Sequence, residues 1–336
     1  MDKESETTKK EIQQILSLKI RKCLAGIPIN YKKLQEIRLR AGMPLMMVYE
    51  GKEYFMSLKG ELTRNIQNAY IVTAAEIKET MEYVSNYSRY AYEQEISQGF
   101  ITVQGGHRVG VAGRIVWDGK KIKNINYISF LNIRLAHQIK GCADKVMPFI
   151  RDKSGFKHTL IISPPRCGKT TLLRDIIRMA ADGDDKHAGM TVGVVDERSE
   201  IGACYMGRPQ NDLGCRADVL DGCPKADGMM MLVRSMSPDV IAVDEIGSKE
   251  DIEAMEYVMN CGIKLIATVH GKDMDEIRNK PILGQMVRER MFQRYILLQA
   301  GSTGVIQSIF DERGSVLYTY SVTLNYQGQH TACYAM

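Results

Sequence analysis

The sequence predicts an α/β protein with a mostly parallel sheet in its C-terminal half and a smaller α+β region before it. After residue 157, short apolar strands such as HTLIIS, TVGVVD, DVIAVD and IKLIATVH alternate with helical segments. Strands that are apolar throughout, with helices between them, are typical of a parallel sheet covered on both faces. The first half instead mixes helices with short strands and tight turns, which is typical of an α+β domain.

We therefore expect four segments. An α+β domain for oligomerisation or partner contact is expected over residues 1–138, and a linker helix with a turn over 139–157. The main domain is expected over 158–325, followed by a tail over 326–336. Within the main domain, a long connection follows the strand TVGVVD, and the last strands, RYILLQ, GVIQSIF and SVLYTYSV, are expected to extend the sheet as antiparallel additions.

The N-terminal region contains several local signals. An apolar stripe predicts helix over residues 11–40, and the next stretch predicts short strands around two glycine-containing turns. Thr73 begins a Thr-x-x-Glu capping box before an apolar repeat, which predicts a helix start. A hairpin is expected around Gly105-Gly106, and a further strand over 125–135.

Composition places the chain in an ordinary class. Its 336 residues suffice for two domains, and 44% apolar and 25% charged residues are typical of soluble proteins. A net charge of +5 permits contact with an acidic membrane or nucleic acid without arguing for either. The eight cysteines form no C-x-x-C pair, so zinc is not expected, and free thiols favour a reducing cytoplasm. The polar N-terminus is not a signal peptide, and no apolar stretch approaches the roughly 20 residues of a membrane span, so a membrane role would need a partner.

Residues 163–171 carry the main functional signal. They read Ser163, Pro164, Pro165, Arg166, Cys167, Gly168, Lys169, Thr170 and Thr171, between a predicted strand and a predicted helix. This is the phosphate-binding P-loop pattern G-x-x-x-x-G-K-[ST], with serine at the first glycine position. Backbone N–H groups and the helix N-terminus would hold phosphate oxygens. We expect Lys169 to contact the β- and γ-phosphates of ATP and Thr170 to bind Mg²⁺.

An acid pair ends the later strand VIAVDEIG. Asp244 and Glu245 would lie at the carboxyl edge of the sheet, where ligands bind in open α/β folds. We expect Asp244 to hold Mg²⁺ together with Thr170, and Glu245 to activate the attacking water as general base. Taken alone, two such carboxylates would be interpreted as caps of the following helix, but the P-loop upstream favours the catalytic interpretation.

Two further strand ends supply candidate residues. Glu197, in the acidic cluster 196–200, is a rival for the general base or a helper that positions metal and water. Its strand could end beside either the P-loop strand or the Asp244 strand, and a plain surface turn with internal ion pairs is an equal alternative. His270 ends the strand IATVH and is a candidate contact to the γ-phosphate.

These motifs together resemble a known family. SPPRCGKTTLLRD, VVDERSEI, RPQNDLGCRADVLDGCPKADGMMMLVRSMSPDVIAVDEIG and LIATVHG resemble the stage III sporulation protein AA family, a group of RecA/AAA-like ATPases similar to type II and type IV secretion ATPases. Secretion ATPases carry a Walker A motif, an Asp box, a Walker B motif and a His box in this order. The corresponding segments here are 163–171, 196–200, 240–247 and 268–271. Ser163 departs from the P-loop glycine, and no four-cysteine metal module is present, unlike in some secretion ATPases.

The resemblance implies a larger assembly. It implies a hexameric ring that powers or assembles the channel between mother cell and forespore in endospore-forming bacteria. It also implies a cytoplasmic location in the mother cell, at the membrane through membrane-anchored channel components. Secretion ATPases use arginines of the N-terminal domain and linker across subunits, so Arg114 and Arg134 are the favoured candidates here, with Arg108 and Arg234 behind them.

Two other functions remain open. A nucleic-acid-dependent ATPase would need a strongly basic face and stacking aromatic residues, and only the segment 83–92, with Arg89, offers tyrosines for this. We favour a helix that packs these tyrosines into the N-terminal core, and therefore expect no nucleic-acid partner. The third possibility is a scaffold that binds ATP and hardly hydrolyses it, for which Ser163 is the hint.

Overall fold

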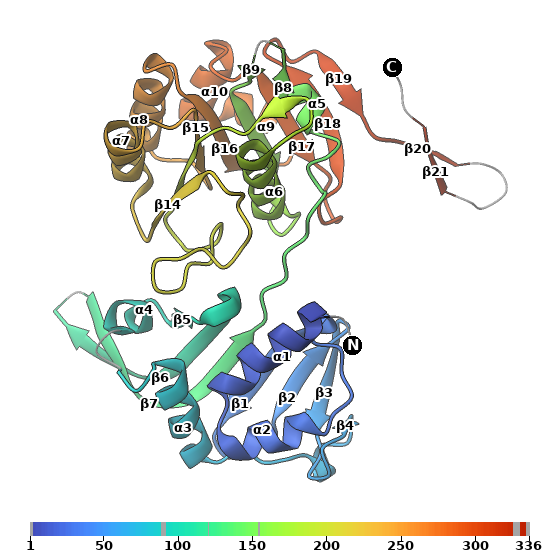
Figure 1. Cartoon of the computed structure of the whole chain (residues 1–336), viewed down its shortest axis with the longest axis vertical. Coiled ribbons are helices and arrows are strands. Elements are labelled where there is room, and N and C mark those ends of the chain that lie inside the picture. Colours follow the sequence, from blue (N-terminus) through green and yellow to red (C-terminus); the bar gives the residue numbers. More distant parts are fainter. Residues whose placement is uncertain (1–2, 89–91, 120, 154, 325–329, 334–336) are drawn as a thin grey trace. The chain divides into compact units, whose positions relative to one another are not determined.

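The chain folds into two compact units. The structure is a computed structural model and describes residues 3–88, 92–119, 121–153, 155–324 and 330–333. The N-terminal unit comprises Met1–His137 and Ala203–Gln210, and the C-terminal unit comprises Gln138–Gly202 and Asn211–Met336 (Figure 1). Each unit has its own sheet, so the predicted fold class is confirmed. The assignment of Ala203–Gln210 to the N-terminal unit is not something that the strand–helix alternation indicated.

The N-terminal unit contains a seven-stranded antiparallel sheet in the order β4-β3-β2-β1-β7-β6-β5. Its strands are β1 (Leu34–Arg40), β2 (Met46–Tyr49), β3 (Lys52–Met56), β4 (Leu62–Thr63), β5 (Phe100–Thr102), β6 (Arg108–Asp118) and β7 (Lys121–Arg134). Its α-helices are α1 (Lys3–Ile15), α2 (Leu18–Ala25), α3 (Ala74–Val84) and α4 (Glu93–Ser97). Apolar side chains of the helices and of one sheet face form a single buried core.

The local signals in this unit are confirmed except in one place. Thr73 caps α3 with a reciprocal capping box to Glu76, and β5 and β6 form the hairpin around Gly105-Gly106. The helix expected over 11–40 is wrong beyond Ala25, because α2 ends there and Leu34–Arg40 is strand β1. Pro28 cannot continue a helix, and the later residues alternate between buried and half-buried positions, as a strand requires.

The C-terminal unit contains an eight-stranded sheet in the order β14-β13-β15-β16-β10-β17-β18-β19. Its strands are β10 (Thr159–Ser163), β13 (Val192–Asp196), β14 (Ala217–Asp221), β15 (Val240–Val243), β16 (Lys264–His270), β17 (Arg294–Leu298), β18 (Ile306–Asp311) and β19 (Val316–Thr319). The first six strands in that order are parallel, and the last two are antiparallel additions.

Helices cover both faces of this sheet, because its central strands are apolar throughout. One face packs against α6 (Lys169–Asp182). The other face packs against four helices: α7 (Lys225–Ser235), α8 (Lys249–Asn260), α9 (Met274–Asn279) and α10 (Pro281–Arg288). Ile161 belongs to the first core and its neighbours Leu160 and Ile162 to the second, as the alternation along a strand requires.

Two expectations for this unit need correction. The antiparallel placement is right for β18 and β19 but wrong for β17, which pairs in parallel with β10. The connection between β16 and β17 contains α9 and α10. It is long enough to return the chain to the other edge of the sheet, so that β17 runs in the same direction as β10. The long connection after β13 contains an edge strand, β14, that the sequence did not indicate.

The linker and the tail are also more structured than expected. In place of one helix, the linker has the single turn α5 (Met147–Ile150) and the short strands β8 (Arg151–Asp152) and β9 (Gly155–Phe156). Near the C-terminus, β20 (Ser321–Leu324) pairs with β21 (His330–Cys333), whereas tail residues 326–329 and 334–336 lie outside the described residues. Among the helices that the structure describes, none has the length and apolar character of a membrane span.

Candidate nucleotide-binding site

The candidate site lies at the carboxyl edge of the parallel sheet. Ser163 ends β10 and is the register partner of His270, which ends β16. Asp244 directly follows β15, the neighbour of β16. Because parallel strands end at one edge, residues more than 100 positions apart in the sequence are brought together there.

The P-loop leads into α6 through a left-handed glycine. Gly168 has φ 90° and precedes Lys169, the first residue of α6. A Cβ atom at Gly168 would lie 2.9 Å from the backbone nitrogen of Gly304, so the loop tolerates no side chain at this position. The N–H groups of the first turn of α6 have no partner within the helix, and with the helix dipole they favour an anion.

Ser163 replaces the first P-loop glycine without backbone strain. It is the last residue of β10, is extended and is fully buried. Its hydroxyl donates a hydrogen bond of 2.8 Å to the carbonyl of Pro164. An extended residue accepts a Cβ atom freely, so this position does not need the conformational freedom of glycine.

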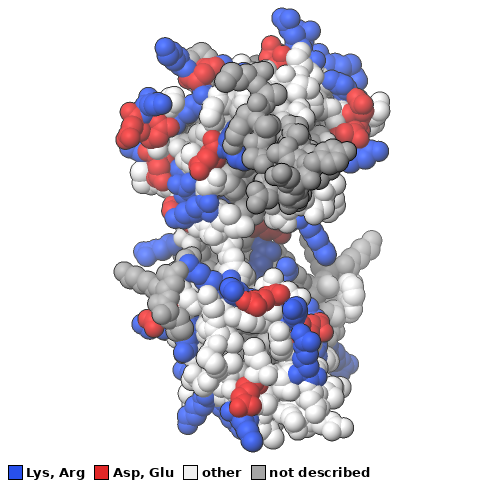
Figure 2. Space-filling model, turned by 90° about the vertical axis from the view of Figure 1, so that its right-hand side faces the viewer, with Lys and Arg blue, Asp and Glu red and all other residues white. Residues whose placement is uncertain are grey.

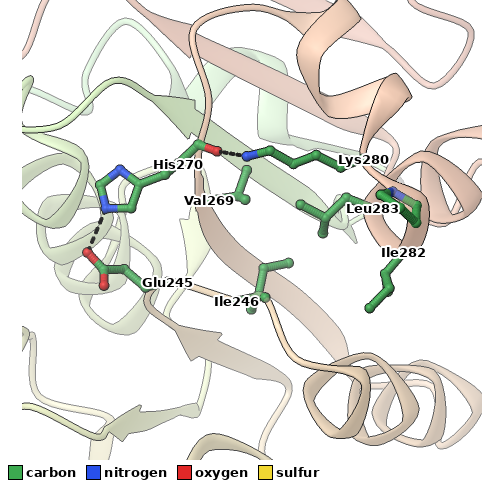
Figure 3. Close-up of a pocket in the computed structure, with 9 residues that line it drawn as sticks. Glu245, Ile246, Val269, His270, Lys280, Ile282 and Leu283 are labelled. Atoms are coloured by element: carbon green, nitrogen blue, oxygen red, sulfur yellow. Dashed lines mark hydrogen bonds and ion pairs between the residues drawn. The ribbon is translucent and has the colours of Figure 1, made fainter.

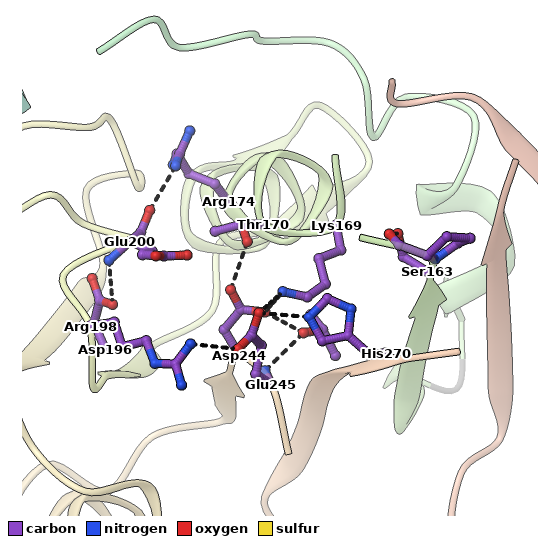
Figure 4. A network of polar contacts seen from close by, with 12 residues as sticks. Ser163, Lys169, Thr170, Arg174, Asp196, Arg198, Glu200, Asp244, Glu245 and His270 are labelled. Carbon is purple, nitrogen blue, oxygen red and sulfur yellow. Dashed lines mark hydrogen bonds and ion pairs between the residues drawn. The ribbon is translucent and has the colours of Figure 1, made fainter. Parts of the chain in front are cut away.

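The predicted ligands and the acid pair form one polar network (Figure 4). The Thr170 hydroxyl donates to Asp244 Oδ2 at 2.7 Å, and Lys169 Nζ lies 3.5 Å from Asp244 Oδ1. Lys169 Nζ also donates to Glu245 Oε1. The lysine is thus paired with both carboxylates.

Glu245 is held from three sides. Besides Lys169, His270 Nε2 lies 3.0 Å from Oε1, and Arg198 Nη1 donates to Oε2 at 2.9 Å (Figure 4). Partial burial alone would raise the pKa of Glu245, but the hydrogen bond and charge of Lys169, with those of His270, outweigh it and lower this pKa below its ordinary value. The carboxyl group is therefore ionised near neutral pH and able to accept a proton.

The acidic cluster 196–200 separates into two roles. Asp196 is 2% exposed and accepts backbone N–H groups of Glu200, Ile201 and Gly202 at 2.7–3.0 Å. Burial raises the pKa of Asp196, and these three donors counteract the shift. Asp196 therefore shapes the loop that follows β13.

Glu197 lies in a different environment from Glu245. Its strand, β13, ends beside β15 rather than beside the P-loop strand β10, which resolves the alternative that the sequence left open. The Glu197 carboxylate forms an ion pair with Lys225 of α7. The structure thus places Glu245, and not Glu197, against the P-loop lysine.

A pocket of about 400 Å³ lies next to Glu245 (Figure 3). Glu245 and His270 lie at one end, and Ile246, Val269, Lys280, Ile282 and Leu283 are among the residues that line the rest. None of its lining residues belongs to the P-loop segment 163–171. The pocket therefore adjoins the Glu245–His270 end of the polar network and not the phosphate-binding loop.

The candidate arginines Arg114 and Arg134 belong to the N-terminal unit and lie on β6 and β7. The Arg134 side chain is largely exposed, with Nε 3.6 Å from Glu36 Oε1, and Arg108 packs over the ring of Phe100. Their action across a subunit interface stays a prediction.

Sequence reasoning missed three polar residues of the network. Arg198 lies in the motif VVDERSEI, and the structure pairs it with Glu245. Arg174 of α6 donates to the carbonyls of Glu200 and Ile201, and buried Thr268 contacts both members of the acid pair. The i+4 spacing of Arg174 from Thr170 was an available signal, because both lie on one face of α6.

The fold and the site together define the chain as a protein of the P-loop NTPase fold. Its structure is similar to the ATPase DotB of Legionella pneumophila, with a TM-score of 0.53 and 15% identity over 84% of this chain and 78% of that one. It is similar to the pilus retraction motor PilT in a structure with bound ADP, with a TM-score of 0.53 and 18% identity over 82% of this chain and 78% of that one.

The sequence matches the family described as "Sporulation stage III, protein AA" over residues 6–317, and the chain belongs to this family. It is 38% identical to the stage III sporulation protein AA of Bacillus subtilis, over 91% of this chain and 96% of that protein. It is also 31% identical to the protein SEEDLING PLASTID DEVELOPMENT 1 of Arabidopsis thaliana, but over only 51% of this chain and 26% of that protein. The resemblance on which the sequence analysis drew is thereby confirmed.

Proposed function

We propose that this protein is an ATPase that hydrolyses ATP with Mg²⁺. The observation that carries the proposal is the contact of Lys169, at the start of α6, with both Asp244 and Glu245, while Thr170 donates to Asp244. A P-loop lysine and a hydroxyl at the start of α6 thus meet the two adjacent carboxylates that follow β15. This is the residue set that phosphoryl transfer to water requires.

The donor set fits a hard cation. Thr170 and Asp244 present oxygen atoms 2.7 Å apart at the helix N-terminus, and oxygen is the ligand type that Mg²⁺ takes. Bound there with the nucleotide, Mg²⁺ would neutralise charge on the β- and γ-phosphates. The main-chain N–H groups of the P-loop and Lys169 would bind and orient the same phosphates.

Nucleotide binding would change the partners of Glu245. Phosphate oxygens compete with Glu245 for Lys169, because both are anionic acceptors of one ammonium group. Loss of that hydrogen bond removes the main influence that lowers the pKa of Glu245, so the carboxylate becomes a stronger base. Glu245 would then take a proton from the attacking water.

At the level of the cell, we propose a secretion-type role in endospore formation. Family membership and the fold shared with DotB and PilT support a homo-oligomer, which we propose to be a hexameric ring. Such a ring would power or assemble the channel between mother cell and forespore. It would act from the mother-cell cytoplasm through membrane-anchored partners.

The proposal is tested with the purified full chain. We expect Mg²⁺-dependent ATP hydrolysis, and we expect Lys169→Ala to lower ATP affinity by about 100-fold or more, since a charge-assisted contact to phosphate is lost. Lys225→Ala is the matched control, because it removes another ion-paired lysine from the same unit and should leave ATP affinity unchanged. Absence of nucleotide binding in the wild-type chain would overturn the proposal.

Two extensions of this assay address the assembly and the alternatives. Activity per chain should rise with protein concentration if the site is completed between subunits. Stimulation by single-stranded DNA or RNA with steep salt dependence would favour a nucleic-acid motor instead. On the face of the C-terminal unit shown in Figure 2, Lys and Arg side chains are interspersed with Asp and Glu, and no continuous basic band is visible there.

A further inference from the structure

Thr268 occupies the centre of the C-terminal sheet beside the acid pair. It lies in β16, two residues before His270, and is fully buried. Its register partner on one side is Ile161 of β10. On the other side, Val243, the last residue of β15, pairs with Ala267, so Thr268 is level with Asp244.

The Thr268 hydroxyl contacts both carboxylate residues through different atoms. The backbone N–H of Glu245 donates to Thr268 Oγ1 at 2.9 Å, and Oγ1 donates in turn to Asp244 Oδ1. The direction of both bonds is fixed, because a backbone N–H can only donate and a carboxylate can only accept. The Thr268 carbonyl adds a third bond by accepting the N–H of Ile246 at 2.9 Å.

These bonds hold a conformation that Glu245 would not adopt by itself. Glu245 has φ 56°, in the left-handed region that residues with a Cβ atom disfavour. Such a conformation persists only where surrounding contacts determine it. Here, two of those contacts come from Thr268, one from its side chain and one from its main chain.

The same hydroxyl also fixes the rotation of the Asp244 carboxylate. Thr268 engages Oδ1, so Oδ2 remains directed at the Thr170 hydroxyl at 2.7 Å. The orientation of the two oxygen-bearing groups that would hold the cation therefore depends on a residue that does not itself touch it.

We propose that Thr268 is a positioning residue that sets the metal-facing rotamer of Asp244 and the backbone conformation of Glu245. This inference rests on the proposed ATPase function and adds a residue to it. Thr268 acts through the acid pair. Loss of the Thr268 hydroxyl should therefore slow the chemical step and weaken the effect of Mg²⁺ on nucleotide affinity, which we call Mg²⁺ coupling. Nucleotide binding without metal should change less.

The decisive variant is Thr268→Val, which keeps the shape of the side chain and removes the hydroxyl. We expect kcat for ATP to fall on the order of tenfold to 100-fold, because the hydrogen bonds of the Thr268 hydroxyl to Asp244 and Glu245 are lost. KM should change by less than about threefold. A fluorescent ATP analogue supplies a readout apart from activity. Thr268→Val should bind it as tightly as wild type in EDTA, and should lose the tightening that Mg²⁺ gives to wild type.

Two further variants separate positioning from folding. Thr268→Ser retains the hydroxyl and should recover kcat to within about threefold of wild type, because the hydrogen bonds can form again. Thr159→Val removes another fully buried hydroxyl, at the opposite end of β10, where it donates to the Lys157 carbonyl at 2.8 Å. It should lower thermal stability much as Thr268→Val does and leave kcat and Mg²⁺ coupling unchanged.

The outcomes distinguish this inference from the function on which it rests. An active wild type in which Thr268→Val matches Thr159→Val in kcat and Mg²⁺ coupling overturns the role of Thr268 alone. The same conclusion follows if Thr268→Ser is as impaired as Thr268→Val. A wild-type chain that neither binds nor hydrolyses ATP overturns the proposed function itself.

Discussion

The two sheets of this chain distribute their polar side chains in different ways. In the C-terminal unit, parallel strands end at one edge, and this collects Ser163, Asp244 and His270 around one helix N-terminus. In the N-terminal unit, the described strands all pair antiparallel, so their carboxyl ends alternate between the two edges of the sheet. There, Arg108 and Arg134 are cross-strand partners along β6 and β7, and Arg134 lies near Glu36. We infer that, within one chain, the C-terminal unit holds the nucleotide-binding and catalytic residues, whereas Arg114 and Arg134 of the N-terminal unit would act only across a subunit interface.

The largest expected effect concerns Glu245. If it is the general base, Glu245→Gln should lower kcat by about 10²–10⁴-fold with ATP binding retained, since a positioned base contributes that much. Glu197→Gln is the matched control, and its kcat should fall only a few-fold, because Glu197 pairs with Lys225. Steady-state hydrolysis and nucleotide binding measure both. Normal turnover in Glu245→Gln with loss in Glu197→Gln would exchange the two roles.

The next effect is on stability in the same unit. Asp196→Asn should lower the free energy of unfolding by about 1–3 kcal/mol, because an amide NH₂ group would face backbone donors that the carboxylate now accepts. Urea unfolding measures this. Asp185→Asn, at an exposed position, is the control and should be neutral. Equal stability of the two variants would show that Asp196 does not support the loop after β13.

A smaller effect is expected in the N-terminal unit. Thr73→Ala removes the cap of α3 and should destabilise the protein by about 1 kcal/mol, whereas Thr73→Ser should preserve most of the stability. Neither change should alter ATP affinity. A loss of ATP affinity in Thr73→Ala would contradict the inference that the nucleotide is bound by the C-terminal unit.

The smallest effect is a dependence of stability on pH. The pKa of Glu245 is lowered in the folded protein, so its ion pair with Lys169 stabilises above the ordinary glutamate pKa of about 4.3. This contribution disappears as pH falls through the folded value. Urea midpoints of wild type and Glu245→Gln should therefore differ slightly near pH 6 and converge as the pH falls below the ordinary glutamate pKa. A gap that widens on acidification would contradict the direction of the shift.

How far the sequence predicts this structure depends on the range of the signal. The P-loop and its flanking strand and helix were recognisable, because the signal lies within one continuous stretch. The capping box of Thr73 is equally local. By contrast, the direction of β17 and the partner of Glu197 depend on which strands become neighbours, and that is decided by packing across the whole sheet.

Part of the site was hidden for the same reason. The role of Thr268 depends on the register between β15 and β16, which brings its hydroxyl level with Asp244. A threonine in an apolar strand is a common feature of β-structure and gives no signal of its own. The pairing of Arg198 with Glu245 likewise joins residues 47 positions apart.

The return of Ala203–Gln210 to the N-terminal unit has a practical consequence. Within that unit, Gln210 accepts the N–H of Gly105 at 2.9 Å, and Tyr205 accepts from the Asn86 amide at 2.7 Å. The chain passes from one unit to the other three times, so no single cut yields both units whole. A fragment that begins at Gln138 would contain Ala203–Gln210 without the N-terminal residues that this segment contacts. A fragment that ends at His137 would lack this segment of the N-terminal unit. Dissection of this protein is therefore better served by point substitutions than by truncation.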